Sequence, residues 1–227
     1  MLYKTKGIII NRKDTGEADK IITIFSETEG RIKAYATGIR RILSKNGGHL
    51  ELFNLSEISL ARLRSGLDKI ATAETIESFK NLRQDLKKTA IAYFFAEIVD
   101  KLTAEKDKNP SVFNLLLETL LFLDKNKSED KFDILSSYFI FNLLDKIGYR
   151  PEINEEFFSS KIKNPVKLSE KALKLIKALL NLSFEATMKI KTDAKRDKEA
   201  RKIAEEYLEY IAEREFKSKR FMKRVHK

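Results

Sequence analysis

The sequence predicts an α+β protein in which a small N-terminal β-barrel is followed by an α-helical domain. In the first 78 residues, short apolar runs rich in β-branched residues alternate with glycine-containing turns, a pattern typical of strands. From residue 79 onward, apolar residues recur at helical spacing and Gly148 is the only glycine. Hydrophobic residues make up 42% of the 227 residues, enough to fill the cores of both parts. We therefore expect two domains, residues 1–78 and 79–227.

Five strands are expected in the N-terminal domain, at residues 2–11, 20–26, 31–37, 51–60 and 67–74. Turns rich in Gly, Asp and Ser separate several of them. Five short strands in fewer than 80 residues indicate a closed or nearly closed barrel, because an open sheet of this size would leave an unpaired edge. An OB-type barrel and an SH3-like barrel both fit this count.

The helical domain is expected to begin with one long helix over residues 80–104 and a second helix starting near Asn109. The segment 131–146 is apolar on most sides, as in a central core helix. Further helices are expected at 169–180, capped by Ser169, and at 194–216. Residues 152–167 are irregular and weakly apolar, and a cysteine-free insert is expected near residues 149–167.

Composition excludes several classes of function. The chain has no cysteine, which excludes disulfides, thiol nucleophiles and cysteine-ligated zinc, and two histidines are too few for a multi-histidine metal site. Neither a membrane-spanning apolar run nor a signal peptide is visible, so a cytoplasmic protein that does not enter the membrane is expected. A net charge of +11 favours a polyanionic partner, with nucleic acid ahead of an anionic membrane surface.

The first concentration of positive charge lies in residues 30–50, which contain five basic residues and no Asp or Glu. Strand alternation places Arg31, Lys33 and Tyr35 on one face, where cations could contact phosphates and the ring could stack on a base. The loop that follows adds cations that suit contact with a phosphate backbone. The predicted DNA-binding set from this segment is Arg31, Lys33, Tyr35, Arg40, Arg41 and Lys45. The alternative is a solvated outer face of the barrel.

A second basic cluster lies in residues 214–227, where seven basic residues accompany one acid. This cluster is either a second contact with DNA, a groove for an acidic peptide that ends in apolar residues, or a solvated helix end. Its candidate contact residues are Lys217, Lys219, Arg220, Phe221, Lys223 and Arg224.

In its order of motifs the sequence resembles RecO, the family of bacterial recombination mediators. The matching pieces are Gly7 to Ile10 followed by Arg12, the turn from Thr15 to Asp19, Ile22-Thr23, Gly30, the run from Ala36 to Arg40 with Ser44, Leu52-Phe53, Ala73-Glu74, Gly148-Tyr149-Arg150-Pro151, Tyr207-Leu208 and the run from Lys217 to Phe221. Together they extend over nearly the whole chain.

The resemblance implies an OB-fold barrel and a bacterial, nucleoid-associated protein of the cytoplasm that is not an enzyme. It implies binding of single- and double-stranded DNA and annealing of complementary strands. We add Arg12 to the predicted contacts with DNA phosphates. The implied protein partners are RecR, single-stranded DNA-binding protein with its acidic tail and, indirectly, RecA. Many relatives carry a four-cysteine zinc module just after the Gly-Tyr-x-Pro segment. Here residues 152–158 contain no cysteine, so no zinc module and no cofactor are expected.

Two other functions fit parts of the sequence. A basic adaptor could bind acidic peptide tails without touching DNA. A carboxylate-metal enzyme could use Asp14, Glu17 and Asp19, although acidic residues in such a turn are usually turn formers.

Overall fold

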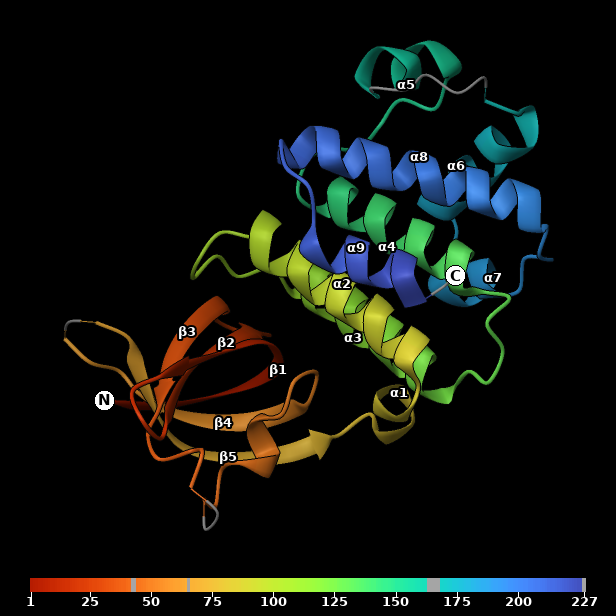
Figure 1. Ribbon diagram of the computed structural model, residues 1–227. Helices are drawn as coiled ribbons and strands as arrows, with labels where there is room; N and C mark the ends of the chain where they lie inside the picture. The colour runs from red at the N-terminus through yellow and green to blue at the C-terminus, as the bar shows by residue number, and fades with distance from the viewer. Residues whose placement is uncertain (42–43, 65, 163–167, 226–227) are drawn as a thin grey trace. The chain divides into compact units, whose positions relative to one another are not determined.

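The computed structural model describes residues 1–41, 44–64, 66–162 and 168–225 (Figure 1). The chain forms two compact units. The first comprises Met1–Lys125 together with Lys217–Lys227, and the second comprises Asn126–Phe216. The last strand ends at Glu77 and the first helix begins at Lys80, so the change from strands to helices occurs inside the first unit.

A closed five-stranded barrel forms the N-terminal part of the first unit, as the sequence predicts (Figure 1). Its strands are β1 (Leu2–Thr15), β2 (Asp19–Ser26), β3 (Gly30–Ala36), β4 (Leu55–Ala61) and β5 (Asp68–Glu77), hydrogen-bonded in the order β1-β2-β3-β5-β4. Alternate side chains such as Ile22, Ile24 and Ile32 point inward and are buried, because successive residues of a strand face opposite sides. Only two residue pairs, Ala34–Asp68 and Tyr35–Lys69, join β3 to β5 in parallel.

Two strand boundaries differ from the prediction. Strand β1 does not end at Asn11, because a bulge between Ile9 and Asn11 shifts its register and pairing with β2 continues to Thr15. The fourth strand begins at Leu55 instead of residue 51. A short 3-10 helix, η1 (Gly48–Leu50), and a turn in which Phe53 has a positive φ of 70° occupy the preceding residues.

Four helices complete the described part of the first unit: α1 (Lys80–Gln84), α2 (Leu86–Leu102), α3 (Pro110–Lys125) and α9 (Lys217–Val225). The prediction of one helix over residues 80–104 was wrong. Asp85 has an extended backbone, and its side chain accepts hydrogen bonds from the N–H groups of Lys87 and Lys88. It therefore ends α1 and caps the start of α2.

The second unit contains α4 (Phe132–Lys146), α5 (Glu155–Lys161), α6 (Glu170–Asn181), α7 (Phe184–Met188) and α8 (Ala194–Ala212). Helix α4 is buried along most of its length, as predicted for a core helix, and it packs against α8 and α6. Helix α8 ends four residues before its predicted end because Glu213 adopts the left-handed conformation. In the cysteine-free region, α5 is capped by Asn154, while residues 163–167 lie outside the described part of the chain.

Within the described ranges, no helix combines the length and apolar character that crossing a membrane requires. The same residues contain no group of three or more acidic or histidine side chains placed to hold a metal ion. Asp14, Glu17 and Asp19 therefore do not form the metal cluster considered from the sequence.

Candidate nucleic-acid interface

The outer face of β3 has the alternation that the sequence predicts. Arg31, Lys33 and Tyr35 are partly exposed, whereas the intervening Ile32 and Ala34 are buried in the barrel. The cations and the aromatic ring of this strand consequently lie on the outside of the barrel.

The Asp19 carboxylate, at the start of β2, holds the beginning of the basic loop. It accepts a hydrogen bond of 2.6 Å from the Gly38 N–H and one of 2.8 Å from the Tyr35 hydroxyl. The backbone bond from Gly38, then the bond from Tyr35, lower the pKa of Asp19, and the charges of Arg41 and Lys69 add to this effect. The hydrogen bond to Asp19 raises the pKa of the Tyr35 hydroxyl. One acid therefore gathers an aromatic ring and two cations at this end of the barrel.

A second carboxylate, Asp14 at the end of β1, lies beside the same loop. It accepts a hydrogen bond from Lys20, which is the main cause of its lowered pKa, and its other oxygen is 3.9 Å from the guanidinium of Arg40. The backbone N–H of Arg40 donates to the carbonyl of Ala18 at 3.0 Å. Asp14 and Asp19, two of the three acids that the sequence offered as metal ligands, thus contact the loop that follows β3.

The outer part of the basic loop carries Arg41 and Lys45, whose side chains are both exposed. Asn46 fixes the end of this loop to β5, because its side chain donates to the Ala71 carbonyl and accepts from the Ala73 N–H. Residues 42–43, between the two cations, lie outside the described part. Among the described residues, neither Arg41 nor Lys45 has a carboxylate within ion-pair distance.

Sequence analysis missed one cation of this group, Lys69. It is exposed on β5, directly opposite Tyr35 in the parallel pair, and its charge contributes to the environment of Asp19. Only the pairing of β3 with β5 brings it there, and the order of strands around a barrel is not readable from strand spacing. We refer to Tyr35, Arg40, Arg41, Lys45 and Lys69 as the loop-end cluster.

At the other end of β3, Arg31 and Lys33 lie next to acids from the helical segment. Arg31 donates to the Thr103 carbonyl at 3.0 Å and pairs with Asp100 at 3.4 Å, and Lys33 lies 3.8 Å from Glu105. The positive charge of residues 30–50 is therefore partly compensated by acids from outside this segment. Residues 30–50 contain no acid, but the fold brings Asp14, Asp19, Asp100 and Glu105 to them.

Arg12 is also committed to a structural contact. Its guanidinium pairs with Glu51, and its side chain is only 16% exposed. An arginine held in this way has little surface to offer a phosphate, so its proposed contact with DNA has no geometric support.

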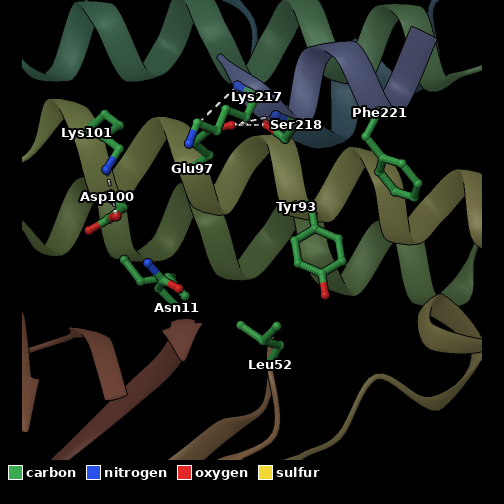
Figure 2. Close-up of a pocket in the computed structure, with 10 residues that line it drawn as sticks. Asn11, Leu52, Tyr93, Glu97, Asp100, Lys101, Lys217, Ser218 and Phe221 are labelled. Atoms are coloured by element: carbon green, nitrogen blue, oxygen red, sulfur yellow. Dashed lines mark hydrogen bonds and ion pairs between the residues drawn. The ribbon is translucent and has the colours of Figure 1, made fainter. Parts of the chain in front are cut away.

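The second basic cluster forms α9, which packs on α2 in the first unit. Both carboxylate oxygens of Glu97 on α2 receive hydrogen bonds from the first turn of α9, from the N–H of Lys217 at 3.1 Å and from the N–H of Ser218 at 2.8 Å (Figure 2). The Ser218 hydroxyl also donates to Glu97. Glu97 thus supplies the N-terminal cap that the sequence of α9 lacks.

A pocket of about 650 Å³ lies between α2, α9 and the barrel. Lys217 and Phe221 of α9 line it together with Tyr93 of α2 and Leu52 of the barrel (Figure 2). The Tyr93 ring makes edge contacts with Phe53 at 5.1 Å and with Phe221 at 6.4 Å between ring centroids. The pocket wall is therefore partly aromatic and partly charged.

The remaining cations of α9 differ in their exposure. Lys217, Arg220 and Arg224 are exposed, whereas Lys219 is buried and is not available to a phosphate. The side chain of Lys223 lies outside the described part. The exposed subset is the part of the predicted second contact that remains a candidate.

Two family models match the chain. The model described as "Recombination protein O N terminal" matches residues 1–79, and the model described as "Recombination protein O C terminal" matches residues 83–220.

Similar curated proteins are called DNA repair protein RecO. The one from Pelotomaculum thermopropionicum is 32% identical over 98% of this chain and 94% of its own length. A relative from Dehalococcoides mccartyi is 38% identical over 67% of this chain, and one from Roseiflexus is 37% identical over 68%. These two alignments span 59% and 53% of the relatives' own lengths.

Proposed function

The chain belongs to the RecO family, and from this premise we propose that it acts in DNA repair by binding DNA and annealing complementary strands. The observation that carries the proposal is the loop-end cluster: Tyr35, Arg41 and Lys69 lie around Asp19, Arg40 lies beside Asp14, and Lys45 is exposed on the same loop. Cations neutralise phosphates, and a ring beside them stacks on a base of any sequence.

Annealing requires two polyanions to approach each other and then to be released as a duplex. Binding to a cationic surface releases counterions from the strand and lowers the repulsion between the two strands. Contacts with phosphates leave the base edges free to pair. Arg40, Arg41 and Lys45 are suited to this because their side chains are exposed on a loop whose two ends are tied down by Asp19 and Asn46.

The cations of α9 support a second contact within the same unit. Arg220, Arg224 and Lys217 are exposed on a helix fixed to α2 by the Glu97 cap. We propose that they extend the DNA path or meet a protein partner. On the family's pattern the protein partners are RecR and single-stranded DNA-binding protein, and the chain assists RecA without bond-making chemistry of its own.

The test is a double substitution, Arg40→Ala with Arg41→Ala. We expect affinity for single strands to fall by a similar factor on all base sequences, by roughly tenfold at low salt, because phosphate contacts are lost. The dependence of log K on log salt should become shallower by about 0.7 for each phosphate contact removed. Fluorescence anisotropy over a salt series measures both quantities. The rate of strand annealing should fall as well, both on bare strands and on strands coated by single-stranded DNA-binding protein.

The matched control removes two exposed cations elsewhere on the barrel, Lys4→Ala with Lys6→Ala on β1. This variant has the same net charge as the test variant. If both variants lose the same affinity and the same salt dependence, overall charge explains the binding and the loop-end cluster does not.

A second candidate function, that of an adaptor for acidic peptides, is favoured by the pocket beside α9. Tyr93 and Phe221 are 40% and 38% exposed there, and the lining also includes the cations Lys101 and Lys217 and the acids Glu97 and Asp100. An adaptor would bind an acidic peptide with aromatic residues and show no affinity for poly-dT at low salt. Titration with both ligands separates the two functions, because steep salt-dependent loss of poly-dT binding supports direct DNA contact.

A further inference from the structure

The segment that follows α2, residues 103–107, covers the start of β3. The Lys106 N–H donates to the Arg31 carbonyl at 2.9 Å, and Glu105 forms a parallel β-bridge with Arg31. At Gly30 the approach is closer still, since a Cβ atom there would lie 2.0 Å from the Asp107 carbonyl oxygen. We call residues 103–107 the cover segment. It occupies the edge of β3 that β5 leaves unpaired.

The cover segment and the end of α2 bring two carboxylates to the outer face of β3, and the two resulting ion pairs differ in burial. The Arg31–Asp100 pair has side chains only 14% and 10% exposed, and Arg31 is also bonded to the Thr103 carbonyl. The Lys33–Glu105 pair is longer, at 3.8 Å, and its side chains are 40% and 42% exposed.

This difference in burial decides in which ion pair a phosphate can replace the carboxylate. Asp100 also lies 3.4 Å from Lys101, but separating Arg31 from it would leave the Arg31 guanidinium, only 14% exposed, without a carboxylate, which is strongly unfavourable. An exposed lysine–glutamate pair at 3.8 Å is weak, because water already screens both charges. A phosphate that arrives as part of a polymer also gains from counterion release, which a single carboxylate does not provide.

We propose that the cover segment is an acidic cover over a further phosphate contact, in which DNA phosphate displaces Glu105 from Lys33 while Arg31 stays paired with Asp100 and holds the segment in place. The proposal rests on the DNA binding proposed above. It gives the two predicted DNA contacts on β3 different roles. Lys33 binds either Glu105 or a phosphate, whereas Arg31 has a structural role.

The proposal has a direct consequence for a charge-removing substitution. In Glu105→Gln the competing carboxylate is absent, so Lys33 is available to phosphate from the start. We expect affinity for poly-dT at low salt to rise by about two- to fivefold, the range set by a weak exposed ion pair. The salt dependence should become steeper by up to about 0.7, as for one added phosphate contact on a single strand.

A closely matched control exists at the opposite side of the barrel. Glu57 on β4 lies 3.7 Å from Lys4 on β1, with side chains 47% and 71% exposed, and the β1–β4 seam lies across the ring from β3. Glu57→Gln changes the net charge by the same amount. We expect this control to leave affinity and salt dependence within error of the wild type.

The decisive comparison adds Lys33→Gln to each background. In the Glu105→Gln background, Lys33→Gln should remove the whole gain in poly-dT affinity. In the wild type, Lys33→Gln should lower the affinity by a smaller factor, because Lys33 is already partly paired with Glu105. The proposal is overturned if Glu105→Gln gives no gain, if Glu57→Gln gives the same gain, or if the gain survives the loss of Lys33. Thermal melting of each variant verifies that the fold is intact.

Failure of this proposal is distinguishable from failure of DNA binding itself. If the wild type binds poly-dT in a salt-dependent manner and Glu105→Gln binds equally, only the cover is refuted. If the wild type shows no binding at low salt, both proposals fall together.

Discussion

At the scale of single residues, the Asp19 carboxylate determines where the basic loop starts, because it holds the Gly38 N–H and the Tyr35 hydroxyl at once. Gly38 has a φ of +65°, a backbone conformation that glycine adopts at little cost. The cations of the loop repel one another, so their charges alone disfavour bringing them close together. Asp19 offsets part of this repulsion near Arg41 and Lys69, and Asp14 does so near Arg40, while Arg40, Arg41 and Lys45 stay exposed.

Removing the charge of Asp19 should therefore destabilise the loop and weaken DNA binding, even though the substitution makes the protein more basic. We expect Asp19→Asn to lower the thermal midpoint at neutral pH and to reduce affinity for single strands. An effect of net charge alone would instead raise the affinity. Anisotropy and thermal melting on the same samples decide between these outcomes.

The pH dependence of this effect follows from the lowered pKa of Asp19. Its contribution to stability is complete above the ordinary carboxyl pKa of 3.8 and is lost as pH falls through the lower pKa of the folded chain. The difference in thermal midpoint between wild type and Asp19→Asn should accordingly shrink in acid. The control for net charge at neutral pH is Glu17→Gln, which removes an exposed carboxylate of the same turn and changes the charge by the same amount.

At the scale of secondary-structure elements, α9 depends on an acid from another helix. Its first turn contains no acidic residue, and Glu97 of α2 receives its free N–H groups. We expect Glu97→Ala to cost about 1 kcal/mol, the usual effect of losing a helix cap. Hydrogen exchange in residues 217–222 should accelerate. Glu97→Gln keeps one acceptor oxygen and should lie between the wild type and the alanine variant.

The strands and helices also show what local sequence can predict. Alternation gave the outer face of β3 correctly, because the pleat depends only on neighbouring residues. The break at Asp85 escaped prediction because helical spacing continues through it, whereas its carboxylate satisfies the amides of Lys87 and Lys88. The extension of β1 to Thr15 depends on a bulge and on pairing with β2, so the pattern of residues 2–11 does not contain it.

At the scale of the whole molecule, ion pairs between residues far apart in the sequence could not be predicted. Asp100 and Glu105 lie about 70 positions from Arg31 and Lys33, and only the contact of α2 and the cover segment with β3 joins them. A count of charges within a window treats these cations as free. The candidate site was therefore predictable in its loop but not at the start of β3.

All proposed DNA contacts belong to the first unit, so the second unit can be perturbed separately. There Arg201 of α8 bridges Asp133 of α4, at 2.7 Å, and Glu205, at 2.9 Å, and its side chain is 15% exposed. Arg201→Met should destabilise the second unit by about 3 kcal/mol, because it removes a largely buried guanidinium that contacts both carboxylates. Affinity for poly-dT should stay unchanged while that unit remains folded.

The adjacent Lys202 provides the control for this prediction. It lies 3.8 Å from Glu206 and is 53% exposed, so Lys202→Met should change stability by less than about 0.5 kcal/mol. Urea unfolding followed by circular dichroism measures both variants. A similar loss from both substitutions would show that the Arg201 network has no special role in stability.

The return of the chain to its first unit sets an order of events during synthesis on the ribosome. Helix α9 packs on α2, yet the residues of the second unit must all be translated before it. The barrel can close early, since its strands are complete by Glu77. The face of α2 that receives α9 cannot be covered by this helix until α9 is translated. Glu97 on α2 and Lys217 on α9 are 120 residues apart in the sequence. Until α9 has been translated, Tyr93 can contact Phe53 but lacks its contact with Phe221, so this apolar face of α2 stays incompletely covered.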